Sequence, residues 1–143
     1  MKLLLHYLRM IDFTVAQRPD AYIANSEYTT KMFHFMIQPS YIRRIIGRNI
    51  SVVENSFSCK IKDGSMVFKP FLITRRRVHR SVRKALRDEC KKYIEEYVQE
   101  KERKDVFQEI INEILQKTMS KKLKKIYPLA VCEIRVAKVD EKL

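Results

Sequence analysis

The residues of this sequence whose type and spacing suit them to chemistry are the basic ones at positions 75–87. Seven of these thirteen residues are arginine or lysine, six of the seven are arginine, and none is acidic. A guanidinium group binds phosphate through two parallel N–H donors and stacks on flat bases, whereas a lysine ammonium does neither. We therefore expect a phosphate-bearing polyanion to contact the following residues: Arg75, Arg76, Arg77, His79, Arg80, Arg83, Lys84 and Arg87.

We call residues 75–87 the arginine cluster. A basic helix face that is only solvated is the alternative interpretation, and the preference for arginine over lysine argues against it. The cluster falls where a strand pattern gives way to a helix pattern, so the free N–H groups of a helix start would add to its attraction for phosphate. Arg76, Arg80, Arg83 and Arg87 would share one helix face if that helix begins early.

Two smaller basic sets accompany the arginine cluster. Arg43, Arg44 and Arg48 would be unremarkable alone, but beside the cluster they suggest one broad basic surface. The second set includes Lys121 and Lys122, and a solvated helix face explains it equally well.

No catalytic or metal-binding pattern accompanies these basic residues. The three histidines are scattered, and the three cysteines form no closely spaced pair of the kind that binds zinc. The two glycines stand alone, so a glycine-rich phosphate loop is also missing from the sequence. We expect a protein that is not an enzyme and that needs no cofactor or metal.

The net charge of +13 over 143 residues is concentrated in one third of the chain. Residues 41–94 hold 15 basic and 4 acidic residues, and the flanking segments are each close to neutral. Such an excess implies a polyanionic partner, either nucleic acid or an anionic membrane. The long helical segments mix acidic with basic residues, unlike a membrane-surface helix, so RNA is favoured over a membrane. The first residues resemble a signal peptide, but His6 and Arg9 interrupt it, and a cytoplasmic location is expected.

The elements that must position these residues alternate between strand and helix. Residues 30–37 suggest a strand, and residues 39–46 suggest a short helix with Pro39 in its first turn and Gly47 in a left-handed position after its end. Residues 49–61 and 66–74 suggest two strands joined at Asp63-Gly64 by a type I′ hairpin turn. Pro70 places the second strand at a sheet edge or at a bulge.

The second half of the sequence has helical spacing. One helix is predicted from about His79, and a second is predicted to be capped by Asp105 and to carry an apolar stripe through Leu115. Alternation around Ile134 predicts a final strand. The predicted fold class is α+β: a small antiparallel sheet or partial barrel with a hairpin, packed with two long C-terminal helices and a closing strand.

Three stretches together resemble a known family. They are TKMFHFMIQPSYIRRIIGR at residues 30–48, the Lys62-Asp63-Gly64 turn with the arginine-rich segment that follows it, and KKIYPL at residues 124–129 with EIR at 133–135. The chain from about Thr29 to Leu143 resembles the archaeal and eukaryotic small-subunit ribosomal protein family eS-one, also called S-three-A. Residues 1–28 form a poorly defined N-terminal segment before this domain.

The resemblance implies a structural protein of the small-subunit platform near the mRNA exit. Its implied partners are small-subunit rRNA, neighbouring ribosomal proteins of the platform and translation initiation factors, with no membrane and no small-molecule substrate. The family's RNA contacts would carry over to Arg43, Arg44, Arg48 and the arginines of residues 75–87.

Two alternatives stay open beside this interpretation. A free RNA-binding regulator would use the same arginines. Residues 6–9 and 18–26 weakly resemble part of a nucleotide-sugar glycosyltransferase, which would make the chain a fragment of an enzyme. The chain also departs from the family in lacking its long basic N-terminal segment, so a reduced protein and an incomplete gene model are both compatible with it.

Overall fold

A computed structural model of the chain describes residues 21–26 and 29–140. The predictions for residues 1–20, including the glycosyltransferase-like stretch at 6–9 and the turn at Arg18-Pro19-Asp20, lie outside this range. The second glycosyltransferase-like stretch, at 18–26, lies partly outside it. The elements, in chain order, are β1 (Ala21–Ser26), β2 (Thr29–Ile37), α2 (Pro39–Ile45), β3 (Val52–Glu54), β4 (Phe57–Ile61), β5 (Gly64–Thr74), α3 (Arg80–Val98), α4 (Arg103–Ile111), α5 (Ile114–Leu123) and β6 (Leu129–Val139).

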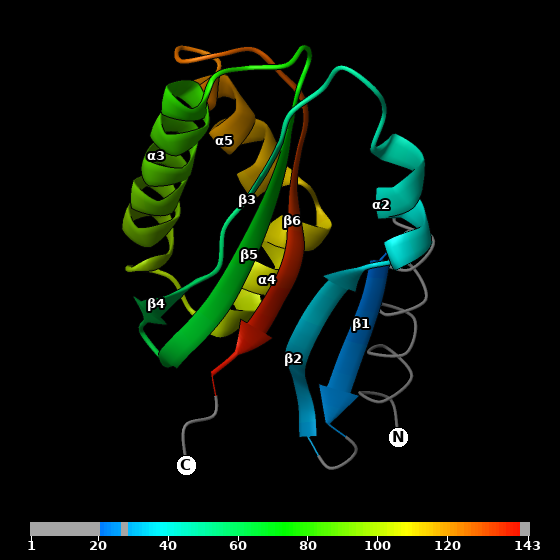
Figure 1. Cartoon of the computed structure of the whole chain (residues 1–143). Coiled ribbons are helices and arrows are strands. Elements are labelled where there is room, and N and C mark those ends of the chain that lie inside the picture. Colours follow the sequence, from blue (N-terminus) through cyan, green and yellow to red (C-terminus); the bar gives the residue numbers. More distant parts are fainter. Residues whose placement is uncertain (1–20, 27–28, 141–143) are drawn as a thin grey trace.

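The described strands form one antiparallel sheet in the order β1-β2-β6-β5-β3, with β4 also paired to β5. The C-terminal strand β6 lies inside the sheet, between β2 and β5, and so joins the N-terminal hairpin to the rest (Figure 1). The sheet is open and does not close into a barrel. The α+β class predicted from the sequence is confirmed.

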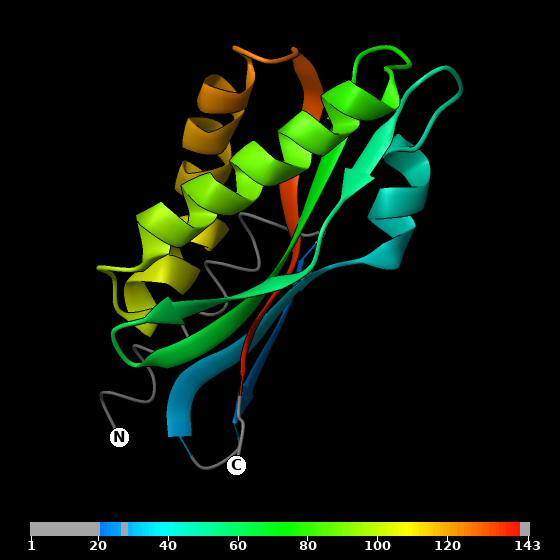
Figure 2. The same ribbon diagram turned by 60° about the vertical axis from the view of Figure 1, so that its left-hand side comes forward.

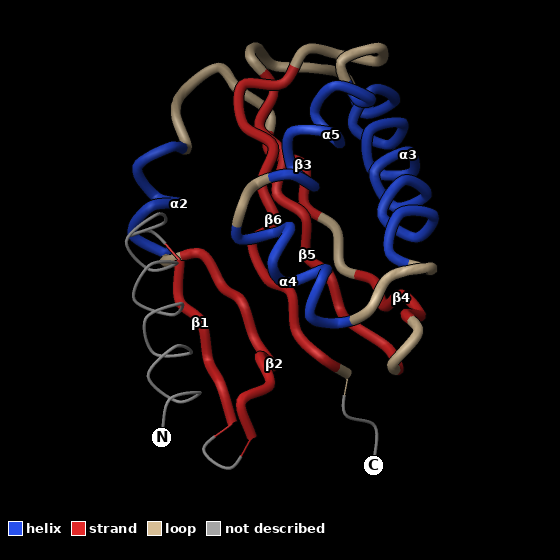
Figure 3. Tube along the Cα trace, turned by 180° about the vertical axis from the view of Figure 1, so that it is seen from behind, coloured by secondary structure: helices blue, strands red, loops and turns tan. Residues whose placement is uncertain are grey.

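The three helices after β5 cover one face of this sheet. Figure 1 shows α4 and α5 behind β5 and β6, and Figure 3, from the opposite side, shows them in front. Figure 2 shows α3 lying across the sheet beside β3 and β4. The main core lies in this layer, where Phe68 of β5, Leu86 of α3, Phe107 of α4 and Leu115 of α5 are each at most 1% exposed. Burial of these apolar surfaces is the main force that holds helices and sheet together.

The predicted hairpin is present, but its turn is centred one residue earlier than expected. Ile61 pairs with Gly64, so Lys62 and Asp63 are the two turn residues, and only Gly64 in this turn has a positive φ, of 140°. The type I′ turn centred on Asp63-Gly64 was therefore wrong. The turn is held against the connection between α3 and α4, since the Lys62 N–H donates to the Lys101 carbonyl at 3.3 Å.

Two predicted strand features differ in detail for physical reasons. The segment 49–61 is broken at Asn55 and Ser56 into β3 and β4, because the Ser56 N–H bonds to the Asn55 side chain at 2.9 Å instead of continuing the ladder. Pro70 lies in the central strand β5, beside a register shift that leaves Arg135 of β6 without an opposite residue. The bulge predicted from Pro70 is confirmed, and the bulge removes the need for a proline N–H.

The second long helix predicted from the sequence is two helices, α4 and α5. The break falls at Asn112 and Glu113, where Glu113 adopts a left-handed φ of 61°. The break lets both helices turn their apolar residues inward. The Ile110 carbonyl accepts the Glu113 N–H at 3.2 Å and also the Gln116 side-chain N–H at 2.9 Å. The predicted Asp105 cap was wrong, because α4 begins at Arg103 and has no side-chain cap.

Helix α2 is present as predicted, with Pro39 in its first turn. Its end differs: Ile46 continues in an extended conformation, and the left-handed residue is Asn49, with φ of 58°, rather than Gly47. Ile42 is buried as expected, whereas Ile46 is 47% exposed.

Candidate nucleic-acid interface

Three connections that carry basic residues meet at one end of the sheet. They are residues 46–51 between α2 and β3, residues 75–79 between β5 and α3, and residues 124–128 between α5 and β6 (Figures 1 and 2). Arg48, the first arginines of the arginine cluster, and Lys124 and Lys125 lie on these connections, all exposed. We call this end of the molecule the basic end.

A buried hydroxyl fixes the start of the arginine cluster to the sheet. Thr74, the last residue of β5, is 0% exposed, and its Oγ1 accepts a hydrogen bond from the Ser51 N–H at 3.0 Å. The same oxygen lies 2.7 Å from the carbonyl oxygen of Arg76 and 3.1 Å from that of Ser51, within range to donate to either. The Ser51 hydroxyl accepts from the Val78 N–H at 3.0 Å. Two of the three connections at the basic end are thus tied together.

Arg75, Arg76 and Arg77 lie on this anchored backbone. All three are exposed, and none forms an ion pair within the described part of the chain. Three adjacent guanidinium groups without an acidic partner repel one another. A polyanion would relieve that repulsion and accept their N–H donors.

The N-terminus of α3 adds backbone donors beside these arginines. The helix starts at Arg80, and its N-cap residue, His79, makes no side-chain capping bond. The first N–H groups of such a helix lack intrahelical partners and carry a partial positive charge. His79, Arg80 and Lys84 are exposed around this end. Because α3 begins at Arg80, Arg76 lies on the loop and does not share the helix face with Arg80, Arg83 and Arg87.

Arg83 and Arg87 lie nearer the sheet than the other members. The Arg87 Nε donates to the Glu54 carbonyl of β3 at 3.2 Å, which fastens α3 to the sheet edge. Arg83 is half-buried, and its Nε is enclosed with no hydrogen-bond partner. The Glu54 carboxylate is itself occupied by Arg135 at 3.2 Å. Arg87 therefore combines a structural contact with its charge, whereas the Nε of the half-buried Arg83 makes no hydrogen bond in the described part of the chain.

The structure places the two smaller basic sets differently. Arg43 and Arg44 are exposed on the last turn of α2, and the Arg44 guanidinium lies 5.9 Å from the centre of the Tyr41 ring. Lys121 is exposed on the last turn of α5. Lys122 instead faces α3, where its Nζ lies 3.6 Å from carboxylate oxygens of both Glu89 and Glu96. Lys122 therefore contributes to helix packing more than to a free basic surface.

The described cysteines are not suited to act as nucleophiles. Burial raises the pKa of both Cys59 and Cys90 to about 12, and burial also raises the pKa of Cys132 well above its usual value. A thiol with such a pKa is protonated at neutral pH and is a poor nucleophile. Within residues 21–26 and 29–140, no three acidic, histidine or cysteine side chains are grouped as metal ligands. No helix in the described part is long and apolar enough to cross a bilayer.

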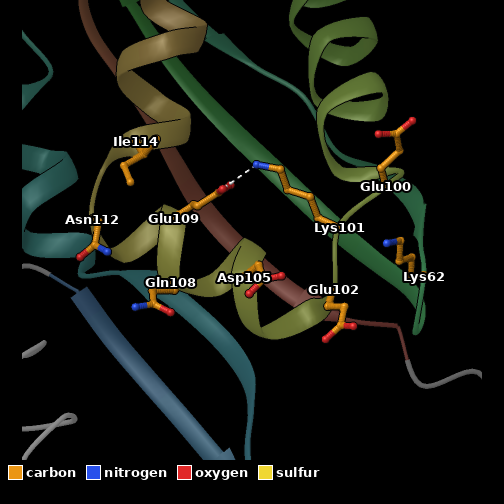
Figure 4. A pocket seen from close by; sticks show the side chains of 9 residues that line it. All are labelled: Lys62, Glu100, Lys101, Glu102, Asp105, Gln108, Glu109, Asn112 and Ile114. Carbon is orange, nitrogen blue, oxygen red and sulfur yellow. Dashed lines mark hydrogen bonds and ion pairs between the residues drawn. The ribbon is translucent and has the colours of Figure 1, made fainter.

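A pocket lies at the end of the molecule opposite the basic end. It has a volume of about 430 Å³ and is lined by charged residues of the α3–α4 connection and of α4 (Figure 4). Lys101 lines this pocket. The Lys101 ammonium is paired with Glu109 and lies 3.6 Å from the centre of the Tyr97 ring. The acidic lining makes this pocket a poor site for RNA.

Sequence reasoning missed Ser51 and Thr74, which hold the arginine cluster in place. The two residues are 23 positions apart and meet only because β3 and β5 pair. The sequence did offer one signal for Thr74: this threonine ends a long apolar strand directly before three arginines.

The comparison with known proteins agrees with the motifs at residues 30–48 and 124–129. The family model described as the Ribosomal S3Ae family matches residues 20–142, which is most of the chain. No curated protein matches the chain significantly. The match includes every basic set described above. The chain therefore belongs to the Ribosomal S3Ae family, which indicates a ribosomal protein of the small subunit.

Proposed function

We propose that this protein is a structural constituent of the small ribosomal subunit that binds rRNA through its basic end. Family membership supports the ribosomal assignment. The observation that carries the RNA-binding part is the anchored loop at Arg75, Arg76 and Arg77, whose three exposed side chains have no acidic partner in the described part of the chain. A rigid backbone with free guanidinium groups is suited to bind phosphates without large entropic cost.

The mode of binding follows from the chemistry of these groups. Arginine contacts to phosphates position a protein on RNA but carry no sequence information. The loop arginines, the start of α3 at Arg80 and Lys84, and Arg48 would bind phosphates of folded rRNA and recognise its shape. Tyr41 lies under the Arg44 guanidinium, so it is less available for stacking on a base.

The proposal includes a location and partners. The motif resemblance supports a position on the platform near the mRNA exit, with neighbouring ribosomal proteins and initiation factors as partners in the cytoplasm. In this setting the acidic pocket beside Lys101 would face protein or solvent rather than RNA. The protein would have no catalytic role in this function.

Sedimentation tests the proposal directly. The tagged full chain is expressed in its source cells, and lysates are resolved on sucrose gradients. We expect the wild-type chain in the small-subunit fraction and a loss of about tenfold or more for the Arg75→Gln/Arg76→Gln/Arg77→Gln variant. The matched control is Lys62→Gln/Lys92→Gln/Lys104→Gln, which removes three exposed charges away from the basic end. A wild-type chain that is absent from small subunits overturns the proposal.

A binding assay separates this proposal from a free RNA-binding regulator. The purified chain is titrated with small-subunit rRNA and with unrelated structured RNAs of equal length. A ribosomal protein that binds phosphates and shape should bind these RNAs within about tenfold of one another. Discrimination by several hundredfold in favour of a short single-stranded sequence would favour the regulator.

A further inference from the structure

The sheet has a second face, opposite the helices, whose composition differs from that of the core. On β2, β4, β5 and β6, the residues that point toward the helices are buried: Phe35, Cys59, Met66, Phe68 and Ala137. Since side chains alternate along a strand, the intervening residues lie on the other face. Figure 1 looks onto that face, with α4 and α5 behind it.

Strand register brings four basic residues together on this open face. Lys138 of β6 lies opposite Val67 of β5 and opposite His34 of β2. Lys69 follows Val67 on the same face of β5, and Lys60 of β4 lies opposite Ser65. Lys60 and Lys138 are exposed, and Lys69 and His34 are half-buried. We call His34, Lys60, Lys69 and Lys138 the sheet-face patch.

Within the described part of the chain, the lysines of the sheet-face patch have no acidic partner, unlike several lysines on the helices. Lys91 pairs with Glu95 at 3.8 Å, and Lys117 pairs with Glu113 at 3.5 Å, each one helical turn apart. In contrast, the three patch lysines form no ion pair within residues 21–26 and 29–140.

The pKa of His34 responds to its burial and to the charges of two of these lysines. Its pKa is lowered by burial first, and then by the charges of Lys138 and Lys69. Its Nε2 is enclosed with no hydrogen-bond partner. Asp140, one residue beyond β6, is the acidic group at the margin, where its N–H donates to the Ser65 carbonyl at 2.9 Å. Clustered lysines without a partner destabilise the folded chain by repulsion, so their arrangement calls for an external anion.

We propose that the sheet-face patch is a second RNA-binding surface, which holds the phosphate backbone of rRNA. The inference rests on the proposed function in that it takes the anionic partner to be rRNA. Lys69 precedes Thr74 by five residues of extended strand, which corresponds to about 17 Å, so the patch reaches different nucleotides from the basic end. The half-buried Val67 and Val136 lie between the lysines on this face.

Salt-dependent RNA binding tests the inference on the full chain. The Lys60→Gln/Lys69→Gln/Lys138→Gln variant is titrated with small-subunit rRNA from about 0.05 to 0.3 M KCl. Each lost phosphate contact lowers the log–log salt slope by about 0.7 to 0.9, so we expect a decrease of about 2 to 3 and a loss of affinity of about 10- to 100-fold at 0.1 M salt. The control Lys62→Gln/Lys92→Gln/Lys104→Gln should change the slope by less than 1.

The outcomes separate this inference from the proposed function. A patch variant with the slope of the control overturns the inference, while loss of binding by the Arg75→Gln/Arg76→Gln/Arg77→Gln variant in the same assay still upholds the basic end. A wild-type chain that binds no rRNA overturns both. Binding of the patch to phosphatidylserine vesicles with unchanged RNA binding would overturn the RNA assignment. If the triple variant misfolds, Lys138→Gln alone must lower the slope by close to 1, and an unchanged slope overturns the inference.

Discussion

The Thr74 hydroxyl provides a sharp test of how the basic end is positioned. Replacement by valine keeps the shape and branching of the side chain but removes its only polar atom. The Ser51 N–H, on a residue that is 7% exposed, loses its acceptor at 3.0 Å. The Ser51 carbonyl is not orphaned, because it still accepts the Thr74 N–H at 3.0 Å. One buried donor is therefore left unsatisfied, and Arg76 loses the anchor for its carbonyl.

The magnitude follows from that count. An unsatisfied buried N–H costs about 1–3 kcal/mol, so Thr74→Val should be less stable than wild type by about that amount. For a chain of this size, the expected fall in Tm is about 3–9 °C. Freeing the arginine loop should also weaken rRNA binding several-fold, because the loop must then be ordered on binding.

The assay compares three chains by urea denaturation and by rRNA titration. Thr74→Ser is the matched control, because it keeps the hydroxyl and loses one methyl, at a cost of about 0.8 kcal/mol. In the Arg75→Gln/Arg76→Gln/Arg77→Gln background, Thr74→Val should have little further effect on RNA binding, since it acts through the loop. A Thr74→Val chain that matches wild type in stability and RNA affinity would refute the anchoring role.

Three other predictions concern the core and the titratable groups. Leu86→Ala should lower the free energy of unfolding by about 2–5 kcal/mol in urea denaturation, because Leu86 is 0% exposed, and a change below about 1 kcal/mol would contradict the packing described. Cys90, with a pKa raised to about 12 by burial, should react with iodoacetamide at pH 8 about 10³-fold more slowly than a free thiol by mass spectrometry, and rapid labelling in the native state would count against its burial. The pKa of His34 is lowered in the folded state, so its contribution to stability is present above about pH 6.5 and is lost as the pH falls toward the folded-state pKa. The free energy of unfolding should therefore decline between pH 7 and 5 more in wild type than in His34→Gln, and identical pH profiles would disprove the effect.

Local signals in the sequence located most of the elements. Alternation predicted the strand at β6, the Asp63-Gly64 pair located the hairpin, and Pro70 predicted either a sheet edge or a bulge, of which the bulge is present. These features depend on backbone preferences of a few adjacent residues. The turn centre was misjudged because pairing of Ile61 with Gly64 depends on the whole ladder between β4 and β5.

The features that sequence reasoning missed depend on contacts between distant residues. The break at Glu113 has no glycine or proline to mark it, and it arises because α4 and α5 must both face the core. The Ser51–Thr74 anchor requires the pairing of β3 with β5. The sheet-face patch depends on strand register, which places Lys138 beside His34 although the two are 104 residues apart. Charge counting could find the arginine cluster, but it could not find a patch of three lysines and a histidine dispersed over four strands.

The central claim is that the arginine cluster lies against rRNA in the small subunit. Arginine-specific modification with phenylglyoxal, read by mass spectrometry, tests it in purified subunits before and after nuclease digestion. The account predicts that Arg75, Arg76 and Arg77 are protected in intact subunits and become reactive once the RNA is digested. Equal reactivity in both samples, or protection that survives complete digestion of the RNA, would contradict it.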